Sequence, residues 1–260
     1  MRQYDDTHWH SIIWRQGLNL REKIIYIYKG PGVSKKSLPH FKKLFQKKTI
    51  HFLSCEEVLK GTWVNDAALF VMPGGADIPY TKKLNGLGNT IIKQYVENGG
   101  IYLGICAGAY YAAKNIVFSK GTESEVTGDR ELSFFQGTIE GPTLAPYHLE
   151  TFEGARAAYV EWNLDRKTAF HSFYNGGGHF INPMQYPNIK VLAIYKDLPS
   201  QPVAAVECSV GKGKAILSGV HFEYDPSLLD DTDPYLKEII PILKKYDSKR
   251  IAFSLVSLLF

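Results

Sequence analysis

Short apolar runs alternate with amphipathic segments along the first half of the chain. Four of these runs predict buried β-strands, at residues 23–28, 49–53, 67–72 and 101–105. Apolar positions at helical spacing predict a helix over residues 34–47, capped by Ser34, and another over residues 88–98. A third helix is expected from Ala107 to about Lys114. This alternation favours a doubly wound, mostly parallel α/β sheet.

After Asn115 the pattern changes to short strand-like segments separated by turn residues. The predicted strands lie at residues 137–140, 158–162, 168–173, 191–195 and 202–206. Residues 164–167 have the composition of a hairpin turn, so this half is expected to add antiparallel strands beside the parallel sheet. A last strand over residues 214–220 precedes a late helix over residues 235–245, which we expect Pro241 to interrupt.

No linker, internal repeat or low-complexity tract divides the chain. We therefore expect an irregular leader over residues 1–22 and a single domain over residues 23–260. Hydrophobic residues make up 45% of the 260 residues, enough to build one large α/β domain. Residues 251–260 are apolar but too short to span a bilayer, so we expect them to dock as a final helix or strand. An interfacial anchor is the alternative for this segment.

Charge and cysteine content narrow the function classes. The net charge of +4 is modest, and the paired lysines fall on solvated helical faces, so no nucleic-acid partner is expected. The three cysteines, Cys55, Cys106 and Cys208, cannot all pair and lack metal-site spacing. A reducing, cytoplasmic location is therefore expected, with structural roles for Cys55 and Cys208 and no metal.

Residues 104–108, Gly-Ile-Cys-Ala-Gly, form the most informative motif in the chain. Gly-x-nucleophile-x-Gly is typical of a nucleophile elbow, in which small residues allow a sharp turn from strand to helix. Such a turn raises the Cys106 thiol above the sheet edge, where the free N–H groups of the next helix favour the thiolate. The alternative is that Cys106 is a small buried core residue.

Two further predicted strands end in residues that complete the chemistry of such a nucleophile. After residues 67–72 come Gly74 and Gly75, which let backbone N–H groups point toward a ligand, as an oxyanion hole requires. The late strand delivers His221, and Glu223 lies on the same face of an extended segment. A carboxylate in this place holds the imidazole in the tautomer that accepts a proton from sulfur.

All three segments end apolar strands, and parallel α/β sheets gather their sites at the carboxyl ends of strands. The sequence therefore predicts a Cys106–His221–Glu223 triad, with the backbone N–H groups of Gly75 and Ala107 as oxyanion donors. The predicted reaction is attack of the thiolate on an amide carbonyl, proton transfer to the leaving group through His221, and release of the acyl group by water. This chemistry requires no cofactor.

Two other segments are candidates for the pocket wall, in addition to Gly74. Residues 175–179 contain three consecutive glycines, so Gly177 is expected to bring the backbone close to a ligand, a flexible loop being the alternative. Residues 128–131, Gly-Asp-Arg-Glu, favour a solvated turn. If this cluster instead faces the site, Arg130 is placed to bind a carboxylate with two hydrogen bonds.

The Pro-Gly-Gly turn, the elbow and the late His-x-Glu together resemble class I glutamine amidotransferase domains. Longer motifs resemble the amidotransferase-like N-terminal domain of fungal-type biotin–protein ligases; they lie at residues 28–34, 73–80, 104–110, 128–132 and 174–178. This resemblance runs from about Ile24 to Glu223 and implies a flavodoxin-like, class I glutamine amidotransferase-like fold. The ligases' own catalytic motifs, an Arg-rich glycine loop and a Lys-Trp-Pro-Asn-Asp-type segment, are not found in this sequence, so biotin ligase activity is not expected.

Tyr110 departs from the amidotransferase pattern, because it stands where the family has a glutamine that helps to hold the substrate. Phe222 is a milder change, since it replaces the proline of His-Pro-Glu without altering the spacing. Tyr110 is expected to line the substrate site and to disfavour glutamine as the substrate. The expected ligand is a small-molecule or peptide amide. Two alternatives stay open, a non-catalytic regulatory or binding module with a protein partner and a glutaminase that supplies ammonia to a separate synthase. These patterns do not specify an oligomeric state.

Overall fold

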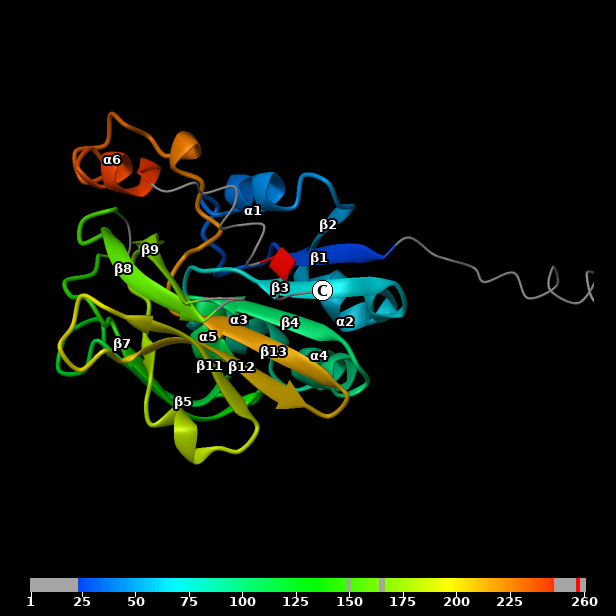
Figure 1. Ribbon diagram of the computed structural model, residues 1–260. Helices are drawn as coiled ribbons and strands as arrows, with labels where there is room; N and C mark the ends of the chain where they lie inside the picture. Colours follow the sequence, from blue (N-terminus) through cyan, green and yellow to red (C-terminus); the bar gives the residue numbers. More distant parts are fainter. Residues whose placement is uncertain (1–22, 149–150, 164–166, 246–255, 258–260) are drawn as a thin grey trace, which may run out of the picture.

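The computed structural model describes residues 23–148, 151–163, 167–245 and 256–257 (Figure 1). Its strands are β1 (Ile24–Tyr28), β2 (Ile50–Leu53), β3 (Ala67–Met72), β4 (Ile101–Ile105), β5 (Ala113–Phe118), β6 (Val126–Asp129), β7 (Phe135–Gly141), β8 (Arg156–Asn163), β9 (Lys167–Tyr174), β10 (His179–Phe180), β11 (Ile189–Tyr195), β12 (Val203–Val210) and β13 (Gly213–Ser218). Its α-helices are α1 (Leu38–Leu44), α2 (Cys55–Lys60), α3 (Asp77–Leu84), α4 (Leu87–Glu97), α5 (Ala107–Tyr111) and α6 (Ile239–Lys244). The leader expected over residues 1–22 and most of the expected turn at 164–167 lie outside the described residues.

Five strands form a parallel core in the order β2-β1-β3-β4-β13. Strands that are covered on both faces are almost continuously apolar, and β3, Ala-Ala-Leu-Phe-Val-Met, has this composition. The register pairs Met72 with Gly104 and Ser218 with Ile105, so β3, β4 and β13 end at nearly the same level. The expected doubly wound, mostly parallel sheet is confirmed, and its carboxyl edge brings three distant segments together.

Alternate residues of the parallel strands face opposite layers, as strand geometry requires. Tyr26, Phe70 and Tyr102 pack in the cluster that includes α2, α3, α4 and α5. Ile25 and Leu69, one residue away in register, pack instead in the cluster that includes α1. Figure 1 shows α1 on one side of the sheet and α2 and α4 on the other, so helices cover both faces.

The second half of the chain extends the sheet with mainly antiparallel strands, as expected. β12 pairs antiparallel with β13, β11 and β10, and β8 pairs with β9 along its whole length. The sheet continues through β7, β5 and β6, of which β5 and β7 are parallel. Trp162 of β8 and Phe170 of β9 pack in the same cluster as α1, so this hairpin covers part of that face.

Several helix boundaries differ from the prediction. α1 begins at Leu38, and Ser37 rather than Ser34 is its N-cap. α5 ends at Tyr111 instead of continuing to Lys114, because the chain enters β5 at Ala113.

The sequence interpretation also missed two helices, α2 and α3. The signal for α2 was present, since Ser54 and Glu57 form a capping box.

The end of the described chain corrects two further expectations. β13 ends at Ser218 rather than at residue 220, so two further residues separate the strand from His221. Pro241 does not interrupt α6, because it lies in the first turn, where backbone N–H groups have no helical acceptor. Of the apolar segment 251–260 only Val256 and Ser257 are described, and Val256 packs against the α1-side core.

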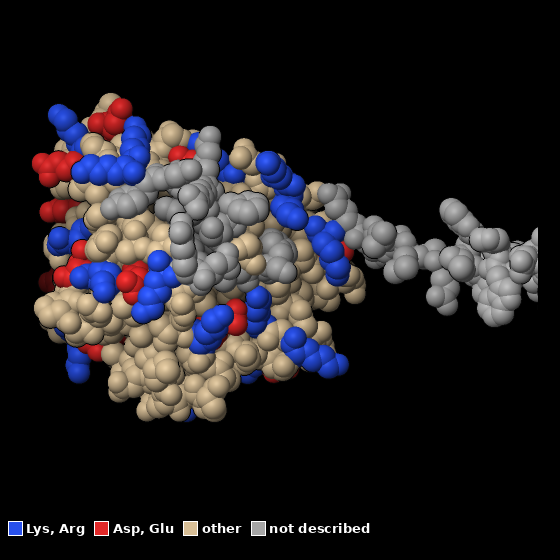
Figure 2. All heavy atoms as spheres, viewed as in Figure 1, with Lys and Arg blue, Asp and Glu red and all other residues tan. Residues whose placement is uncertain are grey.

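The surface carries charges of both signs. In Figure 2, Lys and Arg side chains lie among Asp and Glu on the described part of this face and do not join into one basic stripe. A continuous basic stripe is the usual electrostatic feature of a nucleic-acid binding surface. No helix in the described part of the chain is long and apolar enough to cross a membrane.

Candidate functional site at the carboxyl edge of the parallel strands

Cys106 lies at a sharp turn between β4 and α5. Its φ of 49° is in the left-handed region, and its backbone N–H donates to the carbonyl of Ser218 at the end of β13, 2.8 Å away. A Cβ on Gly104 would lie 2.5 Å from the Gly108 carbonyl oxygen, and a Cβ on Gly108 would overlap the Met72 carbonyl. The glycines of the elbow motif are therefore required by the closeness of the neighbouring backbone.

His221 and Glu223 follow β13 as a buried pair. Nδ1 of His221 lies 2.8 Å from Oε1 of Glu223, and the two residues are 5% and 3% exposed. The His221 backbone N–H donates to the carbonyl of Phe173, which fixes this segment against β9. The intervening Phe222 packs edge-on against Trp162, so it does not disturb the shared face of its neighbours.

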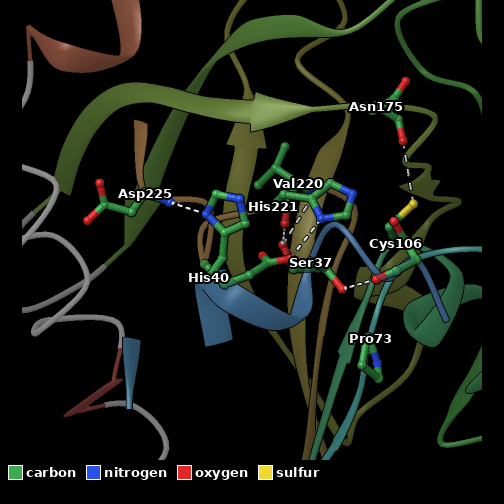
Figure 3. Close-up of polar contacts among 12 residues, drawn as sticks. Ser37, His40, Pro73, Cys106, Asn175, Val220, His221 and Asp225 are labelled. Carbon is green, nitrogen blue, oxygen red and sulfur yellow. Dashed lines mark hydrogen bonds and ion pairs between the residues drawn. The ribbon is translucent and has the colours of Figure 1, made fainter. Parts of the chain in front are cut away.

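The Glu223 contact leaves Nε2 of His221 free to interact with Cys106. Figure 3 shows the imidazole of His221 beside the Cys106 side chain, with the sulfur at 3.6 Å from the backbone oxygen of Asn175. Gly74 makes room for this arrangement, because a Cβ there would lie 2.6 Å from Cε1 of His221 and 3.4 Å from Cβ of Cys106. The imidazole of His221 thus lies between the sulfur of Cys106 and the carboxylate of Glu223.

The surroundings of His221 favour its protonated form. Burial by itself lowers the pKa of the imidazole, but the charge of Glu223 and hydrogen bonds to Cys106 and Glu223 outweigh it and raise the pKa to about 10. In the cysteine–histidine pairs of other enzymes, a protonated imidazole is the group that stabilises the thiolate.

Gly75 and Ala107 line the same cavity as Cys106. Gly75 adopts a φ of 145°, and the backbone groups around it are engaged, with Ser34 N–H on the Gly74 carbonyl and Ala76 N–H on the Gly32 carbonyl. In the described part of the chain, neither the Gly75 nor the Ala107 N–H donates to a backbone carbonyl.

Two cavities open on Cys106 and share Gly75, Ala76 and Tyr147. The first has a volume of about 320 Å³ and extends toward β5 and β6. The second has a volume of about 420 Å³ and is lined by His221 and by residues before α1. Cys106 is only 6% exposed, but it is the point at which both cavities meet.

The other predicted pocket residues have different places. Tyr110 lines the first cavity, and its hydroxyl donates to the Gly176 carbonyl at 3.3 Å. Gly177 lines neither cavity among the described residues, because it packs so closely on Gly219 that any Cβ would overlap that carbonyl. Its neighbours Asn175 and Gly176 form the wall instead.

Arg130 is not in a solvated turn, contrary to the favoured interpretation of residues 128–131. It is 6% exposed, and its Nε donates to Oδ2 of Asp77 at 2.7 Å. Asp77, the first residue of α3, lines the first cavity. The partner of Arg130 is thus a carboxylate of the chain itself, and no local sequence pattern could have identified it.

Sequence reasoning also missed His40, which α1 places beside the site. His40 is 3% exposed, stacks on the ring of Tyr224 at 4.0 Å, and accepts the backbone N–H of Asp225 on Nδ1 (Figure 3). Burial and the nearby His221 lower the pKa of His40 to about 4, so it is neutral at physiological pH. Tyr224 in turn packs edge-on against His221.

No cluster of three His, Cys, Asp or Glu side chains in the described ranges is arranged to hold a metal ion. The site is built from a thiol, an imidazole, a carboxylate and backbone amides. These groups are suited to nucleophilic and proton-transfer chemistry.

Solved structures share this fold. PurLQS from Thermotoga maritima superposes with a TM-score of 0.56 at 12% identity, covering 85% of this chain and 98% of that chain. A cytoplasmic protein from Salmonella typhimurium LT2 superposes with a TM-score of 0.51 at 12% identity, covering 91% and 99%. At this level of identity the likeness concerns the fold.

Sequence relatives are more specific. The chain is 33% identical over 237 residues to a biotin–protein ligase of Schizosaccharomyces pombe, covering 86% of this chain and 35% of the ligase. It is 38% identical over 165 residues to an uncharacterized protein of Chlamydia muridarum, covering 63% of each. The chain thus spans about a third of the length of the first relative and under two thirds of the second. The family model for the biotin-protein ligase N-terminal domain matches residues 23–259, and the chain therefore belongs to this family.

Proposed function

We propose that this protein is a cysteine-dependent amide hydrolase. Cys106 attacks the amide carbonyl, the N–H groups of Gly75 and Ala107 stabilise the oxyanion, and His221 gives its proton to the leaving nitrogen. Glu223 orients His221 and stabilises its charged form. Water then attacks the thioester, and the acyl group leaves as a carboxylic acid while the thiol is restored.

The observation that carries this proposal is the buried contact between His221 and Glu223. The two side chains approach to 2.8 Å, and the imidazole hydrogen-bonds with a cysteine held at a φ of 49°. A strained backbone at a cysteine, a buried carboxylate and a cavity on each side form a combination that core packing alone does not require.

Glutamine fits this site poorly. The position at which glutamine amidotransferases offer a side-chain amide is occupied by Tyr110, whose hydroxyl is already bonded to the Gly176 carbonyl. The three cysteines are all free, which supports the proposal of a reducing, cytoplasmic location.

Alkylation followed by mass spectrometry tests whether the thiol is activated. Cys106 and Cys55 are 6% and 7% exposed, so Cys55 is a control of matched burial. Burial also raises the pKa of the Cys55 and Cys208 thiols. We expect iodoacetamide to modify Cys106 at least about tenfold faster than Cys55 at pH 7, because only Cys106 has an imidazolium neighbour.

The His221→Asn variant should reduce the rate at Cys106 to that of Cys55. Turnover of a panel of amides and activated esters then tests the reaction itself. Cys106→Ala should abolish turnover, whereas Cys55→Ala should retain it. Equal labelling of Cys106 and Cys55 in the wild-type protein contradicts an activated nucleophile.

A second candidate function is a regulatory module for a biotin–protein ligase. It is supported by the Schizosaccharomyces pombe relative, in which the matched segment is 35% of a longer ligase. If this is the function, Cys106→Ala changes the affinity for a separately produced ligase catalytic domain, measured by calorimetry, and no amide is turned over. Turnover without such binding favours the hydrolase.

A further inference from the structure

The two cavities that meet at Cys106 differ in which catalytic groups line them. His221 lines the second cavity and is not among the described residues that line the first. Acyl transfer requires the leaving nitrogen to receive a proton from the imidazole. The amine part of an amide must therefore lie in the His221 cavity, and its acyl part must extend into the other.

The acyl-side cavity is mainly apolar. Ile116 and Phe118 of β5, Val126 of β6 and Tyr110 of α5 line it. Its volume of 320 Å³ equals roughly ten water molecules at about 30 Å³ each, so it accommodates an acyl chain of on the order of eight to ten non-hydrogen atoms. Burying such a chain contributes about 0.8 kcal/mol for each CH₂ group.

The charged groups of the acyl-side cavity are acidic. Glu123 and Glu125 are exposed at its lining, and Asp77 lies deeper and is paired with Arg130. An acyl group that ends in a carboxylate is repelled by these side chains, whereas a neutral chain is not.

The amine-side cavity has the opposite charge. Lys35 and Lys36 line it together with Ser34 and Asn175, and no Asp or Glu of the described ranges does so. Neither lysine forms an ion pair with another described residue, and Lys36 Nζ lies 3.9 Å from the centre of the Phe152 ring at the same cavity. A carboxylate on the amine part of the substrate is attracted to this side.

The geometry points to an N-acyl amino acid as the substrate class, with an uncharged medium-length acyl chain next to β5 and β6 and the amino acid carboxylate at Lys35 and Lys36. This inference rests on the proposed hydrolase function. The amide C–N bond breaks as the bond from Cys106 sulfur to the acyl carbon forms, and the amino acid leaves with a proton from His221. Water hydrolyses the thioester, giving the fatty acid and restoring the thiol. Glutamine has the reverse polarity, since its charged groups are on the acyl part and its leaving group is ammonia.

Four amides and one ester test this assignment in the wild-type protein, and N-acetylglutamate is added for the variants. We expect kcat/KM for N-octanoylglutamate to exceed that for N-octanoylagmatine, N-succinylglutamate and L-glutamine by at least about tenfold, equivalent to about 1.4 kcal/mol. p-Nitrophenyl acetate reports the Cys106 nucleophile independently, because its small acyl group needs neither cavity and its p-nitrophenolate leaving group departs without a proton from His221.

Charge reversal and cavity filling then address the two sides separately. Lys35→Glu combined with Lys36→Glu should lower the octanoylglutamate to octanoylagmatine ratio by about tenfold. Val126→Trp should lower the ratio of octanoylglutamate to acetylglutamate turnover, because indole fills the acyl-side cavity. Lys212→Glu is the matched control, since this exposed lysine precedes β13 at the opposite edge of the sheet, and it should leave both ratios unchanged.

The outcomes separate the two proposals. Cys106-dependent ester hydrolysis with no preference among the amides, or with a preference for L-glutamine, overturns the substrate assignment and leaves the cysteine chemistry standing. Absence of any Cys106-dependent reaction, with the ester as well as the amides, overturns both. A preference for N-octanoylglutamate that the lysine reversal does not alter contradicts the assigned amine side.

Discussion

Gly74 lies directly against the imidazole of His221, and a Cβ at this position would come within 2.6 Å of Cε1. The two residues follow different strands of the parallel sheet, β3 and β13, which are separated by β4. The absence of one methyl group on β3's turn therefore decides where the imidazole of the β13 segment can lie. This contact explains why the turn after β3 requires glycine at position 74.

Replacing Gly74 with alanine should displace His221 and lower Cys106-dependent kcat/KM by about 10²-fold, the loss typical of a misplacement near 1 Å. Steady-state kinetics and a thermal melt measure the two consequences. Gly100→Ala is the control, because its Cβ would meet the ring of Tyr95 as closely, at the opposite edge of the sheet. Equal loss of activity in both variants would show that general destabilisation, and not the position of His221, is responsible.

Neutralising Glu223 should alter the pH dependence of stability. The folded-state pKa of His221, raised to about 10, exceeds the usual value near 6.5. The folded protein therefore binds more protons between these values, and its free energy of unfolding falls as pH rises from 7 to 10. In Glu223→Gln the charge that raises the pKa is gone, so this slope should flatten.

Urea denaturation at pH 7, 8.5 and 10 measures this slope for the wild-type protein and the variant. Tyrosine ionisation contributes equally to both and cancels in the comparison. Identical slopes would mean that His221 is not protonated in the folded protein near neutral pH. We also expect Glu223→Gln to lower turnover by between about 10²- and 10⁴-fold.

His40 should have the opposite effect on the pH dependence of stability, because it should make the free energy of unfolding fall as the pH decreases. Its folded-state pKa of about 4 lies below 6.5, so the unfolded chain binds the extra proton and stability falls as pH decreases from 6.5 to 4. At about 1.4 kcal/mol per pKa unit, the loss is roughly 3 kcal/mol. His40→Asn keeps an acceptor for the Asp225 N–H without a titrating ring, and it should remove this loss in urea denaturation at pH 7 and 4.5.

The buried Arg130–Asp77 pair should be costly to break from one side. Arg130→Met leaves the Asp77 charge uncompensated at a site where both residues are less than 10% exposed, and we expect a loss of about 3–5 kcal/mol in the free energy of unfolding. Asp77→Asn in the same chain should restore part of it. The half-exposed pair of Lys196 and Glu161, 3.9 Å apart, is the control, and Lys196→Met should cost under about 1 kcal/mol. A loss below that of the control would exclude a buried charge at Asp77.

Local patterns predicted the parallel strands well, because each is a mainly apolar run of four to six residues bounded by turn residues. They failed where tertiary contacts decide an element's length. Ala113 continues an apolar helical pattern, but the chain there turns into β5 because the neighbouring β7 offers hydrogen-bond partners. α3 was missed since Asp77–Leu84 has only a weak apolar stripe and is held by packing on α5 and α4.

The candidate site likewise has features that local sequence patterns predicted and features that they did not. The elbow at Cys106 and the spacing of His221 and Glu223 are visible in the sequence, since short-range geometry fixes a sharp turn and an i, i+2 pair. The contacts of Arg130 with Asp77 and of His40 with Tyr224 join residues 53 and 184 positions apart. No local sequence pattern predicts such pairs, because the packing of the sheet and helices determines which distant residues meet.

By itself the sequence determined the order of the candidate chemical groups along the chain: a glycine turn, then a cysteine, then a histidine with its carboxylate. Hydrophobic periodicity and small residues are enough for this, because both act over a few neighbouring residues. Only the tertiary structure decided that Gly74 leaves room for the His221 imidazole and that Gly177 packs away from the cavities. It also decided that the two cavities that open on Cys106 carry opposite charges. These features depend on distances between separate strands and loops. Strand register and the close packing of the interior set those distances, and both exist only in the folded protein.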